Sequence, residues 1–317
     1  MSKTITLGLV GARGHTGSEL LRLVQGHPDL RLAFASSRGL TGQLISHADP
    51  GITLPGEYEN LDPQQTAARA PDVCVLALPN GLARPYVEAM DKACPDTIIL
   101  DLGADYRFDS TWYYGLPELT RERAAGKTRI ANPGCYATAM QLALAPLREY
   151  LHGPAHCTGI SGYSGAGTAP SPKNDPEVLR DNLLPYAPCG HMHEGEVCHQ
   201  LGIRLRFMPH VASFFRGISM TVCASLSTPL SNSQLATIYS EAYAGEPLVK
   251  LQQDIPCVRD NVGLHHATVG GWTSGKDGEY AVVYVTLDNL LKGAATQAMQ
   301  NINLACGLAE LQGIPHD

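Results

Sequence analysis

The chain has 317 residues, 44% of them hydrophobic and 17% charged, and its formal net charge is −7. This size allows two domains, each with its own core, and an acidic balance without a dense run of Lys and Arg argues against a nucleic-acid or membrane surface. Because the nine cysteines contain no CxxC pair, the first residues lack a signal-peptide core, and no apolar run approaches the ~18–20 residues that cross a bilayer, we expect a cytoplasmic protein with reduced thiols.

Strand and helix patterns alternate up to about residue 135. Buried strands are expected at 5–10, 31–35, 73–78, 97–102 and 129–132, and helices at 18–24 and 81–93. Alternation of this kind predicts an α/β fold that begins with a Rossmann-like domain, whose parallel sheet is doubly wound.

A glycine-rich loop joins the first expected strand to the first expected helix, with GxxGxxG spacing over residues 11–17. Glycines there permit a tight turn, close approach of the backbone to a pyrophosphate, and close packing of helix on strand, while the helix N-terminus supplies the anion site. A purely structural turn would also suit this pattern, but the position after the first strand favours dinucleotide binding. The residues expected to bind the cofactor here are Gly11, Arg13, Gly14, His15, Thr16 and Gly17.

The end of the second expected strand discriminates between cofactors. NAD sites usually carry Asp or Glu there for the ribose hydroxyls, but this chain has Ser36, Ser37 and Arg38. Two hydroxyl groups and a guanidinium suit a 2′-phosphate, so the sequence predicts NADP(H) as the cofactor.

One cysteine, Cys135, follows the sharp turn Asn132-Pro133-Gly134 and directly precedes an apolar-periodic helix. Unpaired backbone amides and the positive end of the helix dipole stabilise a thiolate at such a position. A buried structural cysteine is the commoner fate of a free thiol, but the Pro-Gly turn directs this sulfur to the end of an element where ligands bind. We therefore expect Cys135 to be the reactive group.

The pattern changes after the Cys135 helix. A segment rich in Gly, Ser and Pro at 159–172 is followed by longer strands of mixed polarity at 217–226 and 279–287. These strands suit a mixed or antiparallel sheet with one covered face, and hence an α+β domain.

Two helices are expected in this second half. Ser231 and Gln234 form a capping box for a helix that runs to about residue 244. Asp288 or Asn289 is expected to cap a final helix that continues through about residue 307.

A dense polar segment, 186–196, contains His191 and His193. Together with Glu196 and His199 they could hold zinc, since His-x-His and carboxylate spacing suits that ion. Alternatively, one histidine is the general acid/base for Cys135, or the segment is ordinary polar surface. The chain has no second ligand cluster of typical metal spacing, so we favour acid/base work and expect no metal.

A nicotinamide cofactor combined with a reactive cysteine implies acyl and aldehyde redox chemistry through a thioester. If the leaving group is phosphate, the site needs anion-binding groups. The Gly/Ser loop at 161–167 could present backbone amides or be a flexible turn. Arg216 could pair bidentately with a carboxylate or phosphate, or be a solvated charge at a strand end. Lys173 is a further candidate.

Taken together, these motifs resemble the N-acetyl-γ-glutamyl-phosphate reductases, relatives of the aspartate-semialdehyde dehydrogenases. The similarity runs through nearly the whole chain, and its specificity comes from the cysteine motif together with DNLLKGAA. The segments that carry it are GxxGxxG at 11–17, NPGCYAT at 132–138, SGYSGAG at 161–167, PYAPCGHMHEGEV at 185–197, PHVASFFRGI at 209–218 and DNLLKGAATQA at 288–298.

The resemblance implies NADPH-dependent reduction of N-acetyl-γ-glutamyl phosphate to N-acetylglutamate 5-semialdehyde and phosphate, a step of arginine synthesis. It implies that Cys135 is the nucleophile and His191 the acid/base, with His193 as the second candidate for that role. The other site residues that it implies are Ser164, Tyr186, His193, Glu196 and Arg216 for the substrate and Asn289 for the cofactor.

The resemblance also implies a domain plan. The last helix returns to the dinucleotide domain, which gives an NADP-binding domain of residues 1–135 and 288–317 and a catalytic and dimerisation domain at 136–287. The expected assembly is a homodimer or homotetramer.

Two departures from the family pattern remove positive charge near the substrate. Met192 stands where the family usually has Arg between the histidines, and Thr168-Ala169 stands where basic residues often follow SGAG. The reaction type is unaffected, but the acyl chain and the N-acyl group stay open, so a reductase of aspartyl or aminoadipyl phosphate is the nearest rival. The more distant rivals are a zinc hydrolase and a non-catalytic NADP(H)-binding regulator.

Overall fold

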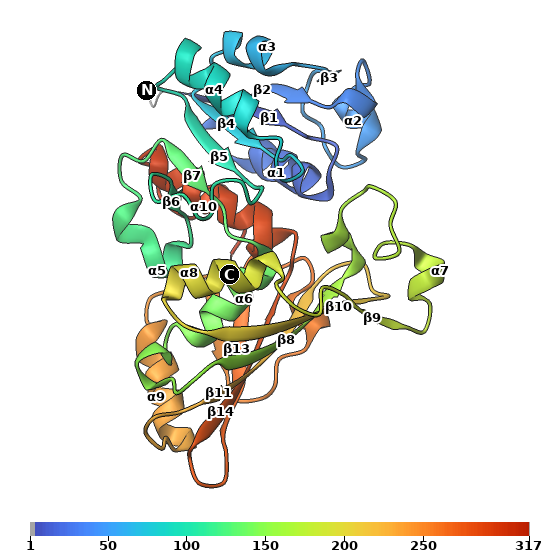
Figure 1. Ribbon diagram of the computed structural model, residues 1–317. Helices are drawn as coiled ribbons and strands as arrows, with labels where there is room; N and C mark the ends of the chain where they lie inside the picture. The colour runs from blue at the N-terminus through green and yellow to red at the C-terminus, as the bar shows by residue number, and fades with distance from the viewer. Residues whose placement is uncertain (1–3, 317) are drawn as a thin grey trace. The chain divides into compact units, whose positions relative to one another are not determined.

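The computed structural model describes residues 4–316 (Figure 1). The chain divides into two compact units. The first runs up to Gly134 and resumes over Ala294–Pro315, and the second is Cys135–Gly293. No helix among the described residues is long and apolar enough to span a bilayer.

The first unit is built on a seven-stranded sheet in which every pair of neighbouring strands is parallel. From one edge to the other, its strands are β3 (Tyr58–Glu59), β2 (Leu30–Ser36), β1 (Ile5–Val10), β4 (Val73–Leu76), β5 (Ile98–Asp101), β7 (Arg129–Ala131) and β6 (Tyr113–Tyr114). The strand order turns back at β1, as in doubly wound nucleotide-binding folds, so the predicted Rossmann-like sheet is confirmed.

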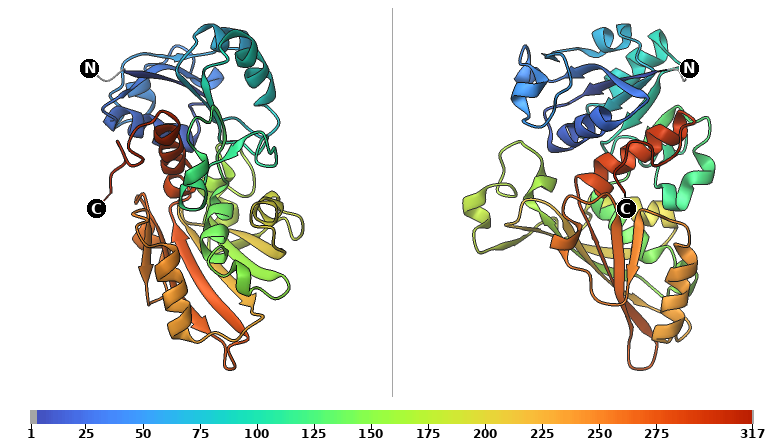
Figure 2. Two further views of the ribbon diagram at one scale, coloured as in Figure 1. Left: turned by 90° about the vertical axis from the view of Figure 1, so that its left-hand side faces the viewer. Right: turned by 180° about the vertical axis from the view of Figure 1, so that it is seen from behind.

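Helices cover both faces of this sheet because successive strand residues point to opposite sides. On β4, Val73 and Val75 pack in the core under α1 (His15–Gly26) and α10 (Thr296–Ala305), which lie side by side (Figure 2). Cys74 and Leu76 of the same strand pack in the opposite core. The helices of that face are α3 (Pro63–Ala68) and α4 (Arg84–Ala93).

The rest of the first unit consists of short elements. They are the helices α2 (Ile45–Ala48) and α5 (Pro117–Thr120) and the 3-10 turns Arg38–Leu40 and Arg121–Arg123. The strand predicted at 5–10 has those limits in the structure, whereas the helix predicted at 18–24 already begins at His15. Its first turn is polar, so the apolar pattern starts one turn late.

The second unit is built on a mixed sheet, as predicted. Two of its strand pairs, β12 with β13 and β8 with β10, are parallel, and the others are antiparallel. In order across the sheet, the strands are β12 (Val249–Gln252), β13 (Ala267–Ser274), β14 (Tyr280–Leu287), β11 (Ile218–Ser225), β8 (Ala155–Gly162), β10 (Leu205–Ala212) and β9 (Leu183–Pro185).

One face of the second sheet carries the core of this unit. Along β11, Ile218, Met220 and Val222 are buried, whereas Ser219 and Thr221 point to the other face and are half-buried. The helices that pack on the buried face are α6 (Cys135–Leu144), α8 (Met192–Leu201) and α9 (Asn232–Ala242). The short elements of this unit are α7 (Pro176–Leu179) and the 3-10 turns Arg148–Tyr150, Tyr163–Ala166 and Val258–Asn261.

The predicted capping box of α9 is confirmed, since Ser231 Oγ accepts the Gln234 amide hydrogen and Gln234 Oε1 accepts that of Ser231. The last helix differs from the prediction of one uninterrupted helix. Asp288 does cap its start, but a π-turn, Leu291–Ala295, precedes α10. The Gly293 amide donates to the Asp288 carbonyl at 2.9 Å, five residues back, which widens this turn.

Candidate active site

The glycine loop between β1 and α1 has the geometry of an anion site. Gly11 has a φ of +83°, and a side chain there would overlap the Ala77 carbonyl oxygen. A Cβ on Gly17 would lie 2.5 Å from the Ala12 carbonyl oxygen, so the first turn of α1 packs directly against the glycine loop. Helix α1 begins after Gly14 with no side-chain cap and no acidic residue in its first turn, which favours a bound pyrophosphate there.

Two guanidinium groups lie beside the end of β2. Arg38 is exposed directly after the strand, and Arg13 reaches the same place from the glycine loop, since a Cβ on Gly39 would come 2.7 Å from Arg13 Nη1. Ser36 and Ser37 are buried, and Ser36 Oγ accepts the Leu61 amide hydrogen at 3.1 Å. The exposed cations, rather than the serine hydroxyls, are therefore available for a 2′-phosphate.

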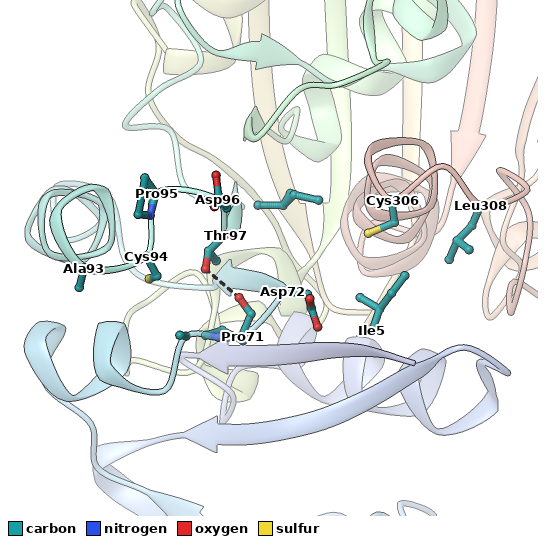
Figure 3. A pocket seen from close by; sticks show the side chains of 12 residues that line it. Ile5, Pro71, Asp72, Ala93, Cys94, Pro95, Asp96, Thr97, Cys306 and Leu308 are labelled. Carbon is teal, nitrogen blue, oxygen red and sulfur yellow. Dashed lines mark hydrogen bonds between the residues drawn. The ribbon is translucent and has the colours of Figure 1, made fainter. Parts of the chain in front are cut away.

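A cavity of about 660 Å³ in the first unit lies at the amino ends of the central strands β1, β4 and β5 (Figure 3). It is lined by residues at the starts of three strands, including Ile5, Asp72 and Ile98, and Thr97 Oγ1 donates to the Pro71 carbonyl at 2.7 Å in its wall. Ligands of parallel sheets bind at the carboxyl ends of the strands, so this cavity is separate from the glycine loop.

Cys135 is the first residue of α6, as the sequence predicts, and it is half-buried. The preceding turn is held by Arg107, whose Nε donates to the Asn132 carbonyl at 2.9 Å. On the other side, a Cβ on Gly293 would come 2.7 Å from Cys135 Cβ. Gly293 was not predicted from the sequence, although the glycine of the DNLLKGAA motif was the available signal.

His191 caps α8 with its own ring. Its Nδ1 accepts the backbone hydrogen of His193 at 3.1 Å. A backbone amide can only donate, so Nδ1 carries the lone pair and the proton of the neutral ring is on Nε2. Burial lowers the pKa of His191, the positive charge of Lys173 lowers it further, and Glu194 opposes both. The site thus favours a neutral ring with an Nε2–H donor.

Three rings surround His191, and one of them belongs to the residue after Cys135. The centroid of the His191 ring lies 4.8 Å from that of His193, 5.5 Å from that of Tyr186 and 6.2 Å from that of Tyr136, the residue after Cys135. Burial raises the pKa of Tyr186, and the negative charge of Cys135 raises it further, so Tyr186 lies within electrostatic reach of the sulfur. Tyr136 is fixed by a 2.7 Å hydrogen bond from its hydroxyl to a backbone carbonyl of β10.

Three of the predicted residues make structural contacts. Arg216 forms an ion pair with the fully buried Asp288, with Nε–Oδ2 at 2.6 Å and Nη2–Oδ1 at 2.9 Å. Asn289 accepts the Gly217 amide hydrogen at 2.7 Å and donates to Ser164 Oγ at 2.9 Å. These bonds fix the 161–167 loop to the start of β11 and to the end of β14.

Glu196 lies on α8 and is fully buried, whereas His199 of the same helix is exposed. Among residues 4–316, no group of three or more His, Cys, Asp or Glu is placed to hold a metal ion. The zinc interpretation therefore has no ligand set in the described part of the chain.

Both halves of the chain match described families. Residues 6–127 match "Semialdehyde dehydrogenase, NAD binding domain" and residues 135–289 match "Semialdehyde dehydrogenase, dimerisation domain". Among solved structures, a probable aspartate-semialdehyde dehydrogenase from Pseudomonas aeruginosa has a TM-score of 0.78 at 21% identity, over 96% of this chain and 99% of that one. The Candida albicans aspartate semialdehyde dehydrogenase with NADP has a TM-score of 0.71 at 16% identity, over 96% of this chain and 99% of that one. At these identities the likeness shows the fold.

Curated relatives are much more similar in sequence. A protein of Xanthomonas campestris pv. campestris (strain B100) is 57% identical over 98% of both chains, and one of Stenotrophomonas maltophilia is 56% identical over 99% of both. A Xylella fastidiosa protein is 53% identical over 99% of this chain and 96% of its own. All three bear the name N-acetyl-gamma-glutamyl-phosphate reductase.

Proposed function

The chain belongs to the N-acetyl-γ-glutamyl-phosphate reductase family, and we propose that it catalyses the reaction that the family name describes. This oxidoreductase reduces N-acetyl-γ-glutamyl phosphate to N-acetylglutamate 5-semialdehyde and releases inorganic phosphate, a step of arginine synthesis. In the structure, the observation that supports this function best is the position of Cys135 at the first residue of α6, with the His191 ring beside the adjoining Tyr136.

NADP(H) is the cofactor. The glycine loop fits its pyrophosphate because Gly11 and Gly17 leave no room for side chains and α1 begins without a cap. We assign the 2′-phosphate to Arg13 and Arg38, and the amides at the start of α1 to the pyrophosphate. When bound, the reduced cofactor supplies the hydride that turns an acyl thioester into an aldehyde.

Cys135 is the proposed nucleophile. Its sulfur forms a bond to the acyl carbon while the bond from that carbon to the phosphate oxygen breaks, and the thiol proton ends on the released phosphate. After reduction of the thioester, the carbon–sulfur bond breaks, the electron pair returns to Sγ, and the aldehyde leaves. The start of α6 stabilises the thiolate in both steps through its backbone amides and dipole.

His191 is the proposed partner of Cys135. Because its Nδ1 accepts from the His193 amide, its Nε2–H is ready to donate to the substrate carbonyl oxygen as negative charge develops there. For Nε2 to take a proton from Cys135, the ring would have to carry its own proton on Nδ1. That proton would point at the His193 amide hydrogen. We therefore assign His191 to hydrogen-bond donation, which refines the acid/base role implied by the resemblance.

The remaining predicted residues divide into two proposed groups. Tyr186 and His193 flank His191 and line the substrate site. Ser164, Glu196 and Arg216 are buried or committed to partners, as Asn289 is, and we assign them to positioning the loops that carry the site.

A homodimer or homotetramer is the proposed assembly, in the cytoplasm. The second unit corresponds to the family's dimerisation domain. The face of its sheet opposite the helices carries half-buried residues such as Ser219, Thr221 and Tyr284, and we assign contact with a second copy to this face.

The function is tested by running the reaction backward, with N-acetylglutamate semialdehyde, NADP+ and phosphate, and by following NADPH absorbance. We expect phosphate-dependent reduction of NADP+ in the wild type, and loss of turnover with retained NADPH binding in Cys135→Ser. Activity of Cys135→Ser close to wild type would refute the nucleophile. His191→Gln keeps an N–H donor and should retain more activity than His191→Ala, whereas equal loss in both would contradict the donor role.

A further inference from the structure

The substrate brings two negatively charged groups into the second unit, where Arg216 is the arginine predicted to bind an anion. An N-acylated γ-glutamyl phosphate carries a phosphoryl group at one end and a carboxylate at the other. Arg216 is already paired with the buried carboxylate of Asp288 through one hydrogen bond and a second ion-pair contact, so its charge is balanced within the protein. With a net charge of −7, the chain as a whole does not attract anions, and a local cation is required.

Lys173 provides a cation that is not balanced in this way. Its Nζ lies 4.9 Å from the centroid of the Tyr186 ring, the side chain is half-buried, and no carboxylate among residues 4–316 forms an ion pair with it. Tyr186 in turn neighbours His191 and is within electrostatic reach of Cys135. The ammonium group is therefore held beside Tyr186 and His191 by a cation–π contact with the Tyr186 ring.

The segment that carries Lys173 is held in place by its neighbour. Asn174 Nδ2 donates to the Gly167 and Ala169 carbonyls at 2.9 and 2.8 Å, and its Oδ1 accepts the Ser171 amide hydrogen at 2.8 Å. These bonds tie residues 167–174 into a closed loop directly after the SGYSGAG motif. The ammonium is thereby positioned on a fixed backbone.

The acidic residues that follow Lys173 are engaged elsewhere. Asp175 Oδ1 accepts the Glu177 amide hydrogen at 2.9 Å at the start of α7, and Glu177 pairs with Arg180. Of the carboxylates that follow Lys173 most closely in the sequence, Asp175 thus caps the start of α7 and Glu177 pairs with the arginine at its end. Lys173 remains available to a ligand.

We propose that Lys173 binds an anionic group of the substrate, either the phosphoryl group or the carboxylate, and that it supplies the charge that this chain lacks at Met192 and Thr168-Ala169. The assignment deepens the proposed function and rests on it. An ammonium bound to an anion is a strong, charge-assisted contact, so its loss is expected to weaken binding more than turnover.

The experiment compares Lys173→Met, Lys173→Arg and the control Lys250→Met, at an exposed lysine of β12 in the same unit. In the backward reaction, KM is measured separately for phosphate and for the semialdehyde. We expect Lys173→Met to raise one of the two by about tenfold or more, with kcat within about threefold, and Lys173→Arg to restore most of the loss. An increase in the phosphate KM assigns the phosphoryl group, and an increase in the semialdehyde KM assigns the carboxylate.

Two results overturn the proposal. One is a Lys173→Met enzyme whose KM values both match those of Lys250→Met, and the other is a fall in kcat alone. Thermal melting of each variant establishes that the fold is intact. A wild-type protein without phosphate-dependent activity would instead refute the proposed function, so the two failures are distinguishable.

Discussion

Replacement of Arg38 by Gln should reverse much of the preference for NADPH over NADH. Arg38 is exposed directly after β2, where the side chains of Ser36 and Ser37 are buried. Arg13 lies against Gly39 at the same place. We assign this pair to the one group that distinguishes the two cofactors, the 2′-phosphate.

The size of the effect follows from exposure. Hydrogen bonds to charged groups contribute about 1.5–3 kcal/mol, and both guanidinium groups are solvent-exposed, which places each near the lower end. About 1.5 kcal/mol corresponds to roughly a tenfold loss of kcat/KM with NADPH for each substitution. If the two contacts are independent, Arg13→Gln combined with Arg38→Gln should lose roughly a hundredfold.

The assay is kcat/KM for NADPH and for NADH in the forward direction. NADH has no 2′-phosphate, so its kcat/KM should stay within about twofold. The matched control is Arg31→Gln, because Arg31 is an exposed arginine at the opposite end of the same strand and donates to nearby carbonyls. Equal losses with NADPH and NADH, or no loss with either, would refute the reasoning.

Three further changes test the stability and geometry of the units. Because burial raises the pKa of Asp101 from 3.8 to about 6, its charged form is disfavoured in the folded state, and relative to Asp101→Asn the wild type should lose about 3 kcal/mol of stability as pH rises from about 4 to 6; a Tm difference between the two that is constant with pH contradicts this. Asp288→Ala removes the buried carboxylate that pairs with the half-buried Arg216 and accepts the Gly263 and Leu290 amide hydrogens, and it should cost about 3–5 kcal/mol in urea unfolding, whereas a cost under about 1 kcal/mol would show a weak pair. Gly293→Ala places a Cβ 2.7 Å from Cys135 Cβ and should lower kcat about tenfold or more with NADPH binding unchanged. The control for it is Gly26→Ala, where a Cβ meets no atom within 4 Å.

Strong local patterns made much of the fold predictable. The run VCVLAL fits a strand buried on both faces, and the structure places its first four residues in β4. The capping box at Ser231 has a chemical signature that needs no tertiary information. By contrast, β3 and β6 have two residues each, which is too short for any periodicity.

The π-turn before α10 could not be predicted because its cause lies far away in the sequence. Gly293 lies so close to Cys135, 158 positions earlier in the sequence, that a Cβ on it would come 2.7 Å from Cys135 Cβ. A regular helix in place of the π-turn would shift Gly293 from this position. The capping of α8 by His191 was missed for a different reason, since it joins residues only two positions apart. Its spacing marked a histidine pair, but only the structure distinguishes which ring nitrogen is occupied.

The candidate site was predictable in its residue types and less so in their roles. Spacing alone left both Arg216 and Lys173 as candidate anion-binding groups, and the resemblance favoured Arg216. The partner of Arg216 is Asp288, which is 72 residues away, so its commitment was invisible before the fold was known. Lys173 depends on a loop closed by Asn174, whose bonds join residues too irregularly spaced to form a motif.

The discontinuous first unit has a consequence for how the protein is made. Helix α10 contributes Ala298, Met299 and Ile302 to the same core as β1 and β4, and Asn301 donates to the Gly115 carbonyl at 2.8 Å. A ribosome delivers these residues only after the whole second unit, so until then the face of the nascent nucleotide-binding sheet that α10 covers is packed by α1 alone. Nascent chains usually fold domain by domain from the N-terminus, but here the second unit is fully synthesised before the first receives α10, so a chain that stops before α10 would leave part of an apolar sheet face exposed and prone to aggregation.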